Sequence, residues 1–388
     1  MGNRDFVIIG ANEFQYKLIL KAKEKGYRTH VFAWQTDDIG EHTADVFYPI
    51  SITEKERILE QCLKIKPAGV ASIASDLAVV TVNYVAEKLG LPGNGTENTE
   101  CCTNKYKMRA CFRKHGIKTP PFFCVSDPSE LEGIQLDYPV IVKPTDRSGS
   151  RGITKVMNPE ELTAAIQKSA EYSFEKKAII EGFLEGSEYS AEFISYNNEH
   201  RCLAITKKFT TGAPHFIETG HMESAPLSDE VYKKIVTVLS GALDALNIKF
   251  GAAHAEFRID SEGEINIIEI GARMGGDCIG SDLVQISTGY DFLGMVIDVA
   301  CGRKPSFAQV CRPNTAFIQF IFTNADIAVL DKIKSENPSA IYEISDIGPV
   351  GKHRVVDSSS RFGYYILACE SPTQGCRLLN KSPQELTI

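Results

Sequence analysis

Two glutamates in a predicted β-hairpin are the strongest candidates for chemistry. Residues 252–259 and 264–270 alternate apolar and polar side chains around the sequence DSEG at 260–263, which predicts two strands joined by a tight turn. Each strand carries one acid where an apolar residue is expected, Glu256 and Glu269. Because side chains alternate between the faces of a strand, these carboxylates share a face only if they lie opposite one another or a bulge intervenes.

Such a pair of acids suits a divalent cation. Magnesium takes one or two protein carboxylates and completes its coordination with substrate phosphates. Direct opposition of Glu256 and Glu269 predicts that Asp260 pairs with Ile265 around a four-residue turn. Either acid alone also fits a solvent-facing strand edge, where glutamate is ordinary. The sequence that follows favours a metal site, because it contains three glycines and Arg273, whose planar fork binds phosphate or carboxylate oxygens.

A lysine before a glycine- and serine-rich loop predicts a phosphate site. Residues 140–153 read VIVKPTDRSGSRGI, so that Lys143 ends an apolar strand just before the loop. Backbone N–H groups of such a loop can approach phosphate oxygens while the lysine supplies a fixed positive charge. The loop is not the GxxxxGK[ST] sequence, which argues against a P-loop fold. By itself the segment fits a surface turn equally well.

A third segment is a strand that breaks and resumes. Residues 179–190 read IIEGFLEGSEYS. Backbone N–H and C=O groups at such a break can bind an adenine edge, and an acid a few residues later can bind ribose hydroxyls. Seen alone, the segment is only a strand, a turn and a strand.

Composition favours a small-molecule partner. The chain has 388 residues, which is long enough for two or three domains. Of these residues, 43% are apolar and 24% are charged, as is ordinary for a globular protein. A formal charge of -8 argues against nucleic acid and anionic membranes as partners. The eleven cysteines form no CxxC pair and are expected to be buried thiols in a reducing compartment. Without a signal-peptide pattern or a membrane-spanning apolar run, the sequence predicts a cytoplasmic protein.

The amino-terminal part alternates strands and helices, which predicts a parallel sheet with right-handed crossovers. Strands are expected at 5–10, 27–34 and 69–73, and helices at 13–26, 54–66 and 78–89. The first strand-helix turn, Gly10-Ala11-Asn12-Glu13, is not the glycine pattern that binds a pyrophosphate. We expect a doubly wound scaffold whose carboxyl edge lines an active site, with Ser75 and Asp76 as further candidates to face substrate.

Turn residues mark the remaining divisions of the chain. Residues 91–95, LPGNG, predict the first boundary, and a helix is expected to begin near Thr103. Short β-type runs then predict a small mixed sheet, and strands at 315–322 and 362–369 predict a carboxy-terminal β-rich module. The predicted domains are 1–100, 101–305 with a small lobe at about 120–185, and 306–388.

These motifs, in this order, resemble the ATP-grasp superfamily from about residue 101 to 301, and the preceding domain also fits. The resemblance implies a mixed α/β and α+β fold. It consists of an amino-terminal Rossmann-like parallel α/β domain, a two-lobed nucleotide-binding centre and a small carboxy-terminal β-rich module.

The resemblance also implies a role for each motif. Lys105 and Lys143 would contact ATP phosphates from the two lobes, and Arg273 would stabilise the transferring phosphoryl group or the acyl-phosphate. The metal ligands would be Glu256 and Glu269. The remaining nucleotide contacts would come from the phosphate loop (Ser148, Gly149, Ser150, Gly152), the adenine hinge (Glu181, Gly182, Phe183, Leu184) and the ribose acid (Glu188). Known members carry asparagine two residues after the second metal acid, where this chain has Gly271, so the third metal ligand is in doubt.

Within the superfamily, residues 214–226 resemble the substrate strand of bacterial L-amino-acid ligases, which make dipeptides. Glu218 and His221 would help to hold the amino-acid substrates, together with Arg273. A hairpin edge with ordinary polar residues explains the same segment.

The function implied by the resemblance is an ATP- and Mg²⁺-dependent ligase that joins a carboxylate to an amine through an acyl-phosphate. Two Mg²⁺ ions are expected, for which Mn²⁺ can substitute, and a homodimer is compatible with the family. One alternative is an enzyme that activates bicarbonate or formate, as in biotin carboxylase, carbamoyl phosphate synthetase or purine biosynthesis. Another is a nucleotide-binding module without catalysis.

Overall fold

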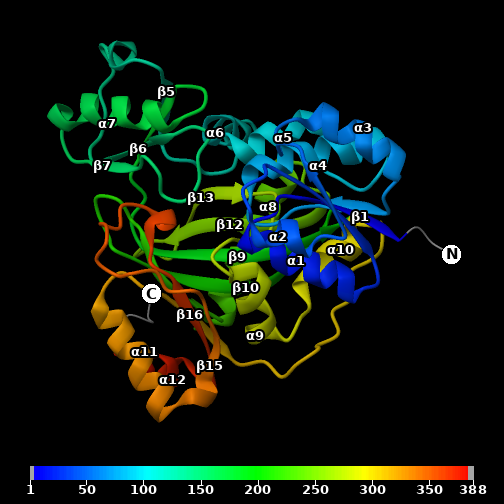
Figure 1. Ribbon diagram of the computed structural model, residues 1–388. Coiled ribbons are helices and arrows are strands. Elements are labelled where there is room, and N and C mark those ends of the chain that lie inside the picture. The colour runs from blue at the N-terminus through cyan, green and yellow to red at the C-terminus, as the bar shows by residue number, and fades with distance from the viewer. Residues whose placement is uncertain (1–3, 383–388) are drawn as a thin grey trace.

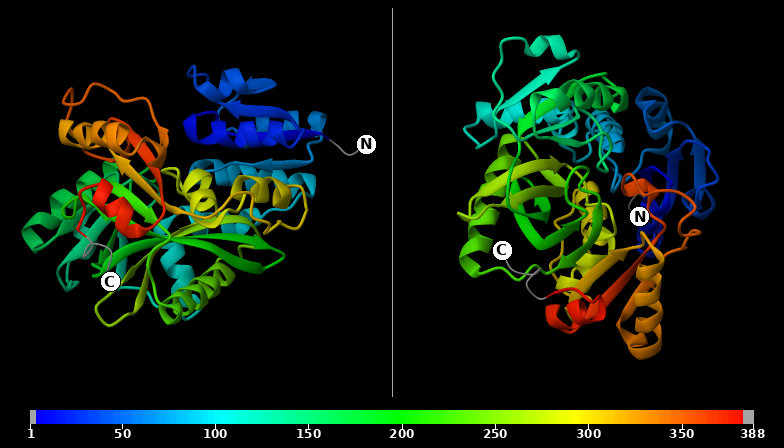
Figure 2. Two further views of the ribbon diagram at one scale, coloured as in Figure 1. Left: turned by 90° about the horizontal axis from the view of Figure 1, so that it is seen from below. Right: turned by 90° about the vertical axis from the view of Figure 1, so that its left-hand side faces the viewer.

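The computed structural model describes residues 4–382, arranged as three sheets with flanking helices (Figure 1). The amino-terminal strands lie on one side of the molecule, and a small lobe containing α7 and β5–β8 projects at another. Seen from below, α10 and its neighbours lie between the amino-terminal layer and the strands of the largest sheet (Figure 2).

The amino-terminal layer is a four-stranded sheet in the order β3-β2-β1-β4, and all its pairings are parallel. The predicted parallel α/β arrangement is therefore confirmed; β3 and α2 were not predicted. The elements are β1 (Asp5–Ile9), α1 (Glu13–Glu24), β2 (Arg28–Ala33), α2 (Ile39–Thr43), β3 (Val46–Pro49), α3 (Lys55–Ile65), β4 (Gly69–Ala71) and α4 (Asp76–Leu89).

The turn between β1 and α1 is built to start a helix. Asn12 accepts a hydrogen bond from Phe14 N–H, and Gln15 completes a capping box. Gly10 has φ +103°, and a Cβ there would lie 2.8 Å from Gln15 Oε1. Helix capping and close packing therefore explain this turn.

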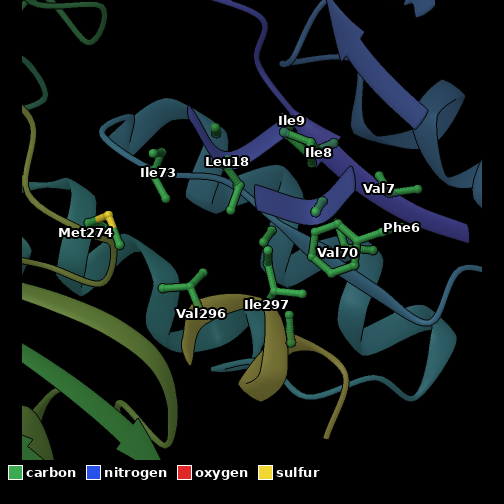
Figure 3. Packing of buried hydrophobic residues seen from close by; sticks show 14 of the residues in the cluster. Phe6, Val7, Ile8, Ile9, Leu18, Val70, Ile73, Met274, Val296 and Ile297 are labelled. Atoms are coloured by element: carbon green, nitrogen blue, oxygen red, sulfur yellow. The ribbon is translucent and has the colours of Figure 1, made fainter. Parts of the chain in front are cut away.

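The amino-terminal core continues across the predicted boundary near residue 100. Figure 3 shows Phe6, Ile8 and Val70 of the amino-terminal sheet in one apolar cluster with Met274 and Ile297 from later in the chain. Burial of these side chains from water fixes the amino-terminal layer against the rest of the molecule.

Charged groups flank this apolar contact. Lysines four residues apart on and just after α1, Lys17, Lys21 and Lys25, project toward acids of later segments, as helical spacing allows. The pairs are Lys17–Asp282 (2.7 Å), Lys17–Glu343 (2.8 Å), Lys21–Asp291 (3.3 Å) and Lys25–Asp298 (3.0 Å). We call this row the α1 lysine stripe.

The small lobe is an antiparallel sheet in the order β5-β8-β6-β7 with α7 packed on it. Helices α5 (Thr96–Thr103) and α6 (Lys105–Lys114) lead into it, so that the helix expected near Thr103 begins at Lys105. Its elements are β5 (Phe122–Val125), η1 (Pro128–Leu131), β6 (Val140–Pro144), β7 (Thr154–Val156), α7 (Pro159–Tyr172) and β8 (Ala178–Gly182).

The largest sheet has eight strands in the order β13-β12-β9-β10-β11-β14-β16-β15, and its pairings are antiparallel. Its first half consists of β9 (Ser187–Tyr196), β10 (Glu199–Thr210), β11 (Glu218–Glu223), β12 (Phe250–Ile259) and β13 (Ile265–Gly271). The accompanying helices are α8 (Asp229–Ala245), η2 (Ile279–Leu283), α9 (Val284–Thr288) and α10 (Phe292–Ala300).

The carboxy-terminal strands extend this same sheet, because β14 pairs with β11. The segment is also partly helical. Its elements are β14 (Thr315–Phe320), α11 (Asn324–Glu336), η3 (Pro338–Ala340), β15 (Ile341–Ile344), η4 (Ser358–Ser360), β16 (Tyr364–Cys369) and α12 (Pro372–Leu378). The predicted domain boundaries stay predictions, and residues 1–3 and 383–388 of the outer domains lie outside the described part of the chain.

Within residues 4–382, no helix combines the length and apolar character needed to cross a membrane. All eleven cysteines lie in this range as free thiols.

Candidate active site

An open cavity of about 1010 Å³ lies between the small lobe and the first strands of the large sheet. Most residues predicted for the site line it, although they come from distant parts of the chain. They are Lys105, Lys143, Ser148, Gly149, Ser150, Glu181, Gly182, Phe183, Leu184, Glu188, Glu218, Glu256, Glu269 and Arg273. Gly152 and His221 do not line the cavity.

The two candidate metal acids face the same cavity. Glu256 on β12 lies directly opposite Glu269 on β13. The register shifts immediately after this pair, so the expected pairing of Asp260 with Ile265 is wrong: Ile265 pairs with Ile259. The hairpin contains both features that were posed as alternatives, direct opposition and a bulge.

Each candidate metal acid is paired with a buried lysine. Lys105 Nζ lies 2.9 Å from Glu269 and donates to Arg147 O at 2.6 Å, while Lys208 Nζ lies 2.6 Å from Glu256. Burial disfavours charge on Glu256, but Lys208 and His254 outweigh it and hold the pKa of that carboxyl well below its usual range. Glu256 is therefore an anion at neutral pH.

The two facing carboxylates fit a cation whose remaining coordination positions are filled by a bound ligand. Within the described residues, no group of three or more His, Cys, Asp or Glu side chains could hold a metal by itself. Two facing carboxylates leave coordination positions for phosphate oxygens and water, as magnesium sites with nucleotides require. Glu256 and Glu269 are the residues that would hold it.

Lys143 belongs to a buried cluster of three charges. Its Nζ lies 2.6 Å from Glu181 Oε2, and Arg109 Nε donates to Glu181 Oε1 at 2.6 Å. Burial opposes ionisation of Glu181, but Arg109 and Lys143 outweigh it and lower the pKa of the carboxyl to about 2. Burial also lowers the pKa of Lys143.

Two backbone N–H groups of the predicted adenine hinge already donate hydrogen bonds within the protein, which the sequence did not indicate. The N–H groups of Gly182 and Phe183 donate to the carbonyls of Pro121 (3.0 Å) and Pro139 (3.1 Å). In this conformation, these two donors are not available to a base, so an adenine edge would need other groups of the hinge. Glu188, expected at the ribose, accepts from Arg258 at 2.8 Å.

The glycine- and serine-rich loop adopts left-handed backbone conformations at Gly149, Ser150 and Gly152 (φ +73°, +57° and +70°). Ser150 Oγ donates to Phe216 O at 3.4 Å, which links the loop to the segment between β10 and β11. Gly152 has a packing role, because a Cβ there would lie 3.0 Å from both Pro144 and Tyr172.

The two candidate substrate residues of the segment 214–226, Glu218 and His221, differ in their access to the cavity. Glu218 lines the cavity and accepts from Ser358 Oγ at 2.6 Å. His221 is buried outside it, with Nε2 3.5 Å from Asp277, and burial lowers the pKa of the imidazole. The structure therefore gives His221 no direct access to the cavity.

Arg273 reaches the cavity with its charge already partnered. Its Nε and Nη2 donate to Asp76 at 2.7 and 3.2 Å. Asp76 begins α4 after the β4 strand, so the carboxyl edge of the amino-terminal sheet does contribute to this region.

Sequence reasoning missed several cavity charges. Arg109, His254 and Arg258 line the cavity, and Lys208 lies beside Glu256. A signal for two of them was present, because residues two positions apart on a strand share a face. The alternation that placed Glu256 in the cavity also places His254 and Arg258 there.

Comparisons with known proteins agree with this architecture. Residues 136–282 match the family described as ATP-grasp domain. An L-amino acid ligase from Bacillus licheniformis superposes with a TM-score of 0.84, at 25% identity over 98% of this chain and 97% of that one. An N5-carboxyaminoimidazole synthetase from Staphylococcus aureus complexed with ADP gives 0.77 at 15% identity, over 99% and 97% of the two chains, a likeness of fold alone.

The sequence relatives include ligases. An alanine–anticapsin ligase of Bacillus subtilis is 27% identical over 295 residues, which cover 68% of this chain and 61% of that protein. A D-alanine–D-alanine ligase of Flavobacterium johnsoniae is 26% identical, covering 65% of this chain and 84% of that protein. The chain thus spans about three fifths of the length of the alanine–anticapsin ligase it matches. The predicted fold class and the family resemblance are confirmed.

Proposed function

We propose that the chain is an ATP-grasp ligase that joins a carboxylate substrate to an amine with consumption of ATP. The observation that carries this proposal is the facing pair Glu256 and Glu269 in a cavity that also receives Lys105 from α6 and Lys143 from β6 of the small lobe. Cations and metal-binding acids around one hollow suit the charge that spreads over a transferring phosphoryl group.

The chain's own residues would act mainly by binding and orientation. Lys143 and Lys105 would exchange part of their contact with Glu181 and Glu269 for phosphate oxygens of ATP. Arg273 would orient the carboxylate that attacks the γ-phosphate, giving ADP and an acyl-phosphate. Magnesium, when bound by Glu256 and Glu269, supplies charge neutralisation at the transferring phosphoryl group.

Amide formation completes the reaction. The amine attacks the acyl-phosphate carbonyl and phosphate leaves, so no protein nucleophile is needed. Water would destroy the acyl-phosphate, and the loop at 148–152 would exclude it. Amino acids are the proposed substrates, supported by the ligases among the relatives and by Glu218 in the cavity wall.

The test is a coupled assay of ADP release with purified protein, ATP and Mg²⁺. Pairs of L- and D-amino acids, bicarbonate and purine precursors are supplied separately, and products are identified by mass spectrometry. We expect turnover that requires an amino acid and yields a peptide or amide. Turnover that requires bicarbonate and no amino acid would eliminate the proposal, and tight ATP binding without turnover would indicate a non-catalytic module.

A further inference from the structure

We infer that Arg109 is a positioning residue that holds the register of the two candidate metal acids and couples it to the phosphate-facing lysine Lys143. The inference rests on the proposed function, since Glu256 and Glu269 are taken as the metal ligands. Two observations support it: a bulge in β13 and the four hydrogen bonds that the buried guanidinium of Arg109 donates.

The bulge decides whether the two acids can face each other. From the hairpin end, Ile265 pairs with Ile259 and Ile267 with Phe257. Continuing this register would place Ile268 opposite Glu256 and would turn Glu269 to the other face of the sheet. One extra residue, Ile268, shifts the register so that Glu269 lies opposite Glu256.

Side-chain positions agree with that reading of the pairing. Ile268 and Glu269 are consecutive, yet both line the cavity. In a regular strand, consecutive side chains point to opposite faces, so a shared face marks the bulge. The metal site therefore depends on keeping this local irregularity in place.

Arg109 binds the backbone on which the irregularity occurs. Its Nη1 donates to Ile267 O and its Nη2 to Ile268 O, both at 2.9 Å. Arg109 is 1% exposed, so bulk water does not compete for its N–H donors. A bulge interrupts the ladder of strand hydrogen bonds, and a buried arginine that donates to both carbonyls stabilises the interrupted form.

The same guanidinium holds the small lobe. Arg109 Nε and Nη2 donate to the two oxygens of Glu181 at 2.6 and 3.4 Å, and Glu181 Oε2 also contacts Lys143 Nζ at 2.6 Å. One side chain thus links β13, which carries Glu269, to β8, whose Glu181 contacts Lys143 of the neighbouring strand β6. Only a planar fork with several donors can serve these four acceptors together.

Substitutions can separate the two sets of Arg109 contacts, those with the backbone carbonyls of β13 and those with the carboxylate of Glu181. Arg109→Lys keeps the charge but cannot reach both carbonyls and the carboxylate. Glu181→Gln removes the carboxylate and leaves the hydrogen bonds from Arg109 to the carbonyls of Ile267 and Ile268. Lys17→Met removes a cation of the α1 lysine stripe that does not line the cavity and serves as a stability control.

The measurement is calorimetric binding of a non-hydrolysable ATP analogue across a range of Mg²⁺ concentrations. For Arg109→Lys we expect the Mg²⁺ concentration for half-maximal binding to rise about tenfold or more, the usual effect of losing a group that orients metal ligands. Glu181→Gln should weaken nucleotide binding without Mg²⁺ while keeping the wild-type Mg²⁺ requirement. Lys17→Met should change only the thermal midpoint.

A folded Arg109→Lys protein with the wild-type Mg²⁺ requirement would overturn the inference while leaving the proposed function intact. Absence of Mg²⁺-dependent nucleotide binding in the wild type would instead overturn both. If Arg109→Lys does not fold, Arg109→Gln replaces it, with the same expected shift and the same contradicting result.

Discussion

Ion pairs gather in two regions of the molecule, and the regions differ in what surrounds them. At the cavity, Lys105 and Lys143 line the hollow and Lys208 lies beside the lining residue Glu256; their side chains are 7%, 5% and 3% exposed. In the α1 lysine stripe, the cations of Lys17, Lys21 and Lys25 are 20%, 17% and 27% exposed and lie between packed elements.

The difference shows that lysine–carboxylate pairs can have two roles, binding of a ligand at the cavity and stabilisation of the fold in the α1 lysine stripe. A buried lysine beside a cavity can exchange a carboxylate for a phosphate without leaving a charge unpaired, whereas losing its partner outright is costly. Pairs in the α1 lysine stripe have no entering ligand and are partly screened by water. We therefore expect substitutions in the cavity to change activity and those in the stripe to change stability.

The largest expected effect is at the metal acid. Glu269→Gln removes one carboxylate from the facing pair, so turnover should fall about a thousandfold, the scale of a metal's contribution to charge stabilisation. Steady-state kinetics measure it. Glu264→Gln, in the same hairpin but paired with the half-exposed Lys234, is the matched control and should keep normal rates. Wild-type turnover in folded Glu269→Gln would remove Glu269 from the site.

A buried acid outside both groups sharpens the comparison. Glu223 accepts hydrogen bonds from Thr206 and from Ser287 (2.8 Å), and burial raises the pKa of its carboxyl to about 8 from a usual 4.5. The folded state therefore binds this proton more tightly than the unfolded chain does. Its contribution to stability is complete below about pH 4.5 and is lost as pH rises through about 8.

Glu223→Gln mimics the protonated acid at every pH. Between pH 5 and 8.5, the free energy of unfolding of the wild type should fall relative to this variant by on the order of 3 kcal/mol. Urea unfolding across this range measures it. Parallel pH profiles for the two proteins would show that Glu223 does not titrate in this window.

The smallest expected effect is in the α1 lysine stripe. Lys17→Met should lower the free energy of unfolding by about 1 kcal/mol at low ionic strength, and the difference should shrink in 1 M salt as charges are screened. Turnover should be unchanged. Lys23→Met, which removes a more exposed pair with Asp45, is the control and should have less effect. A loss that does not depend on salt would assign the role of Lys17 to packing.

Local patterns predicted much of the fold and many of the residues that line the cavity. Strand and helix spacing gave the parallel amino-terminal sheet, and the DSEG turn with its alternating flanks gave the hairpin of β12 and β13. Strand-end position placed Lys143 at the cavity. The hinge was less predictable, because its N–H groups bond to carbonyls of Pro121 and Pro139, which lie far away in the sequence.

The sequence by itself determined which side chains could do chemistry, because residue type, alternation and turn preference act over a few neighbouring residues. The tertiary structure alone decided that Glu256 and Glu269 face each other. That outcome depends on one extra residue in β13, Ile268, which is bound by Arg109 from 159 residues earlier in the chain. A contact between such distant segments forms only when the whole chain packs, so no local pattern specifies it.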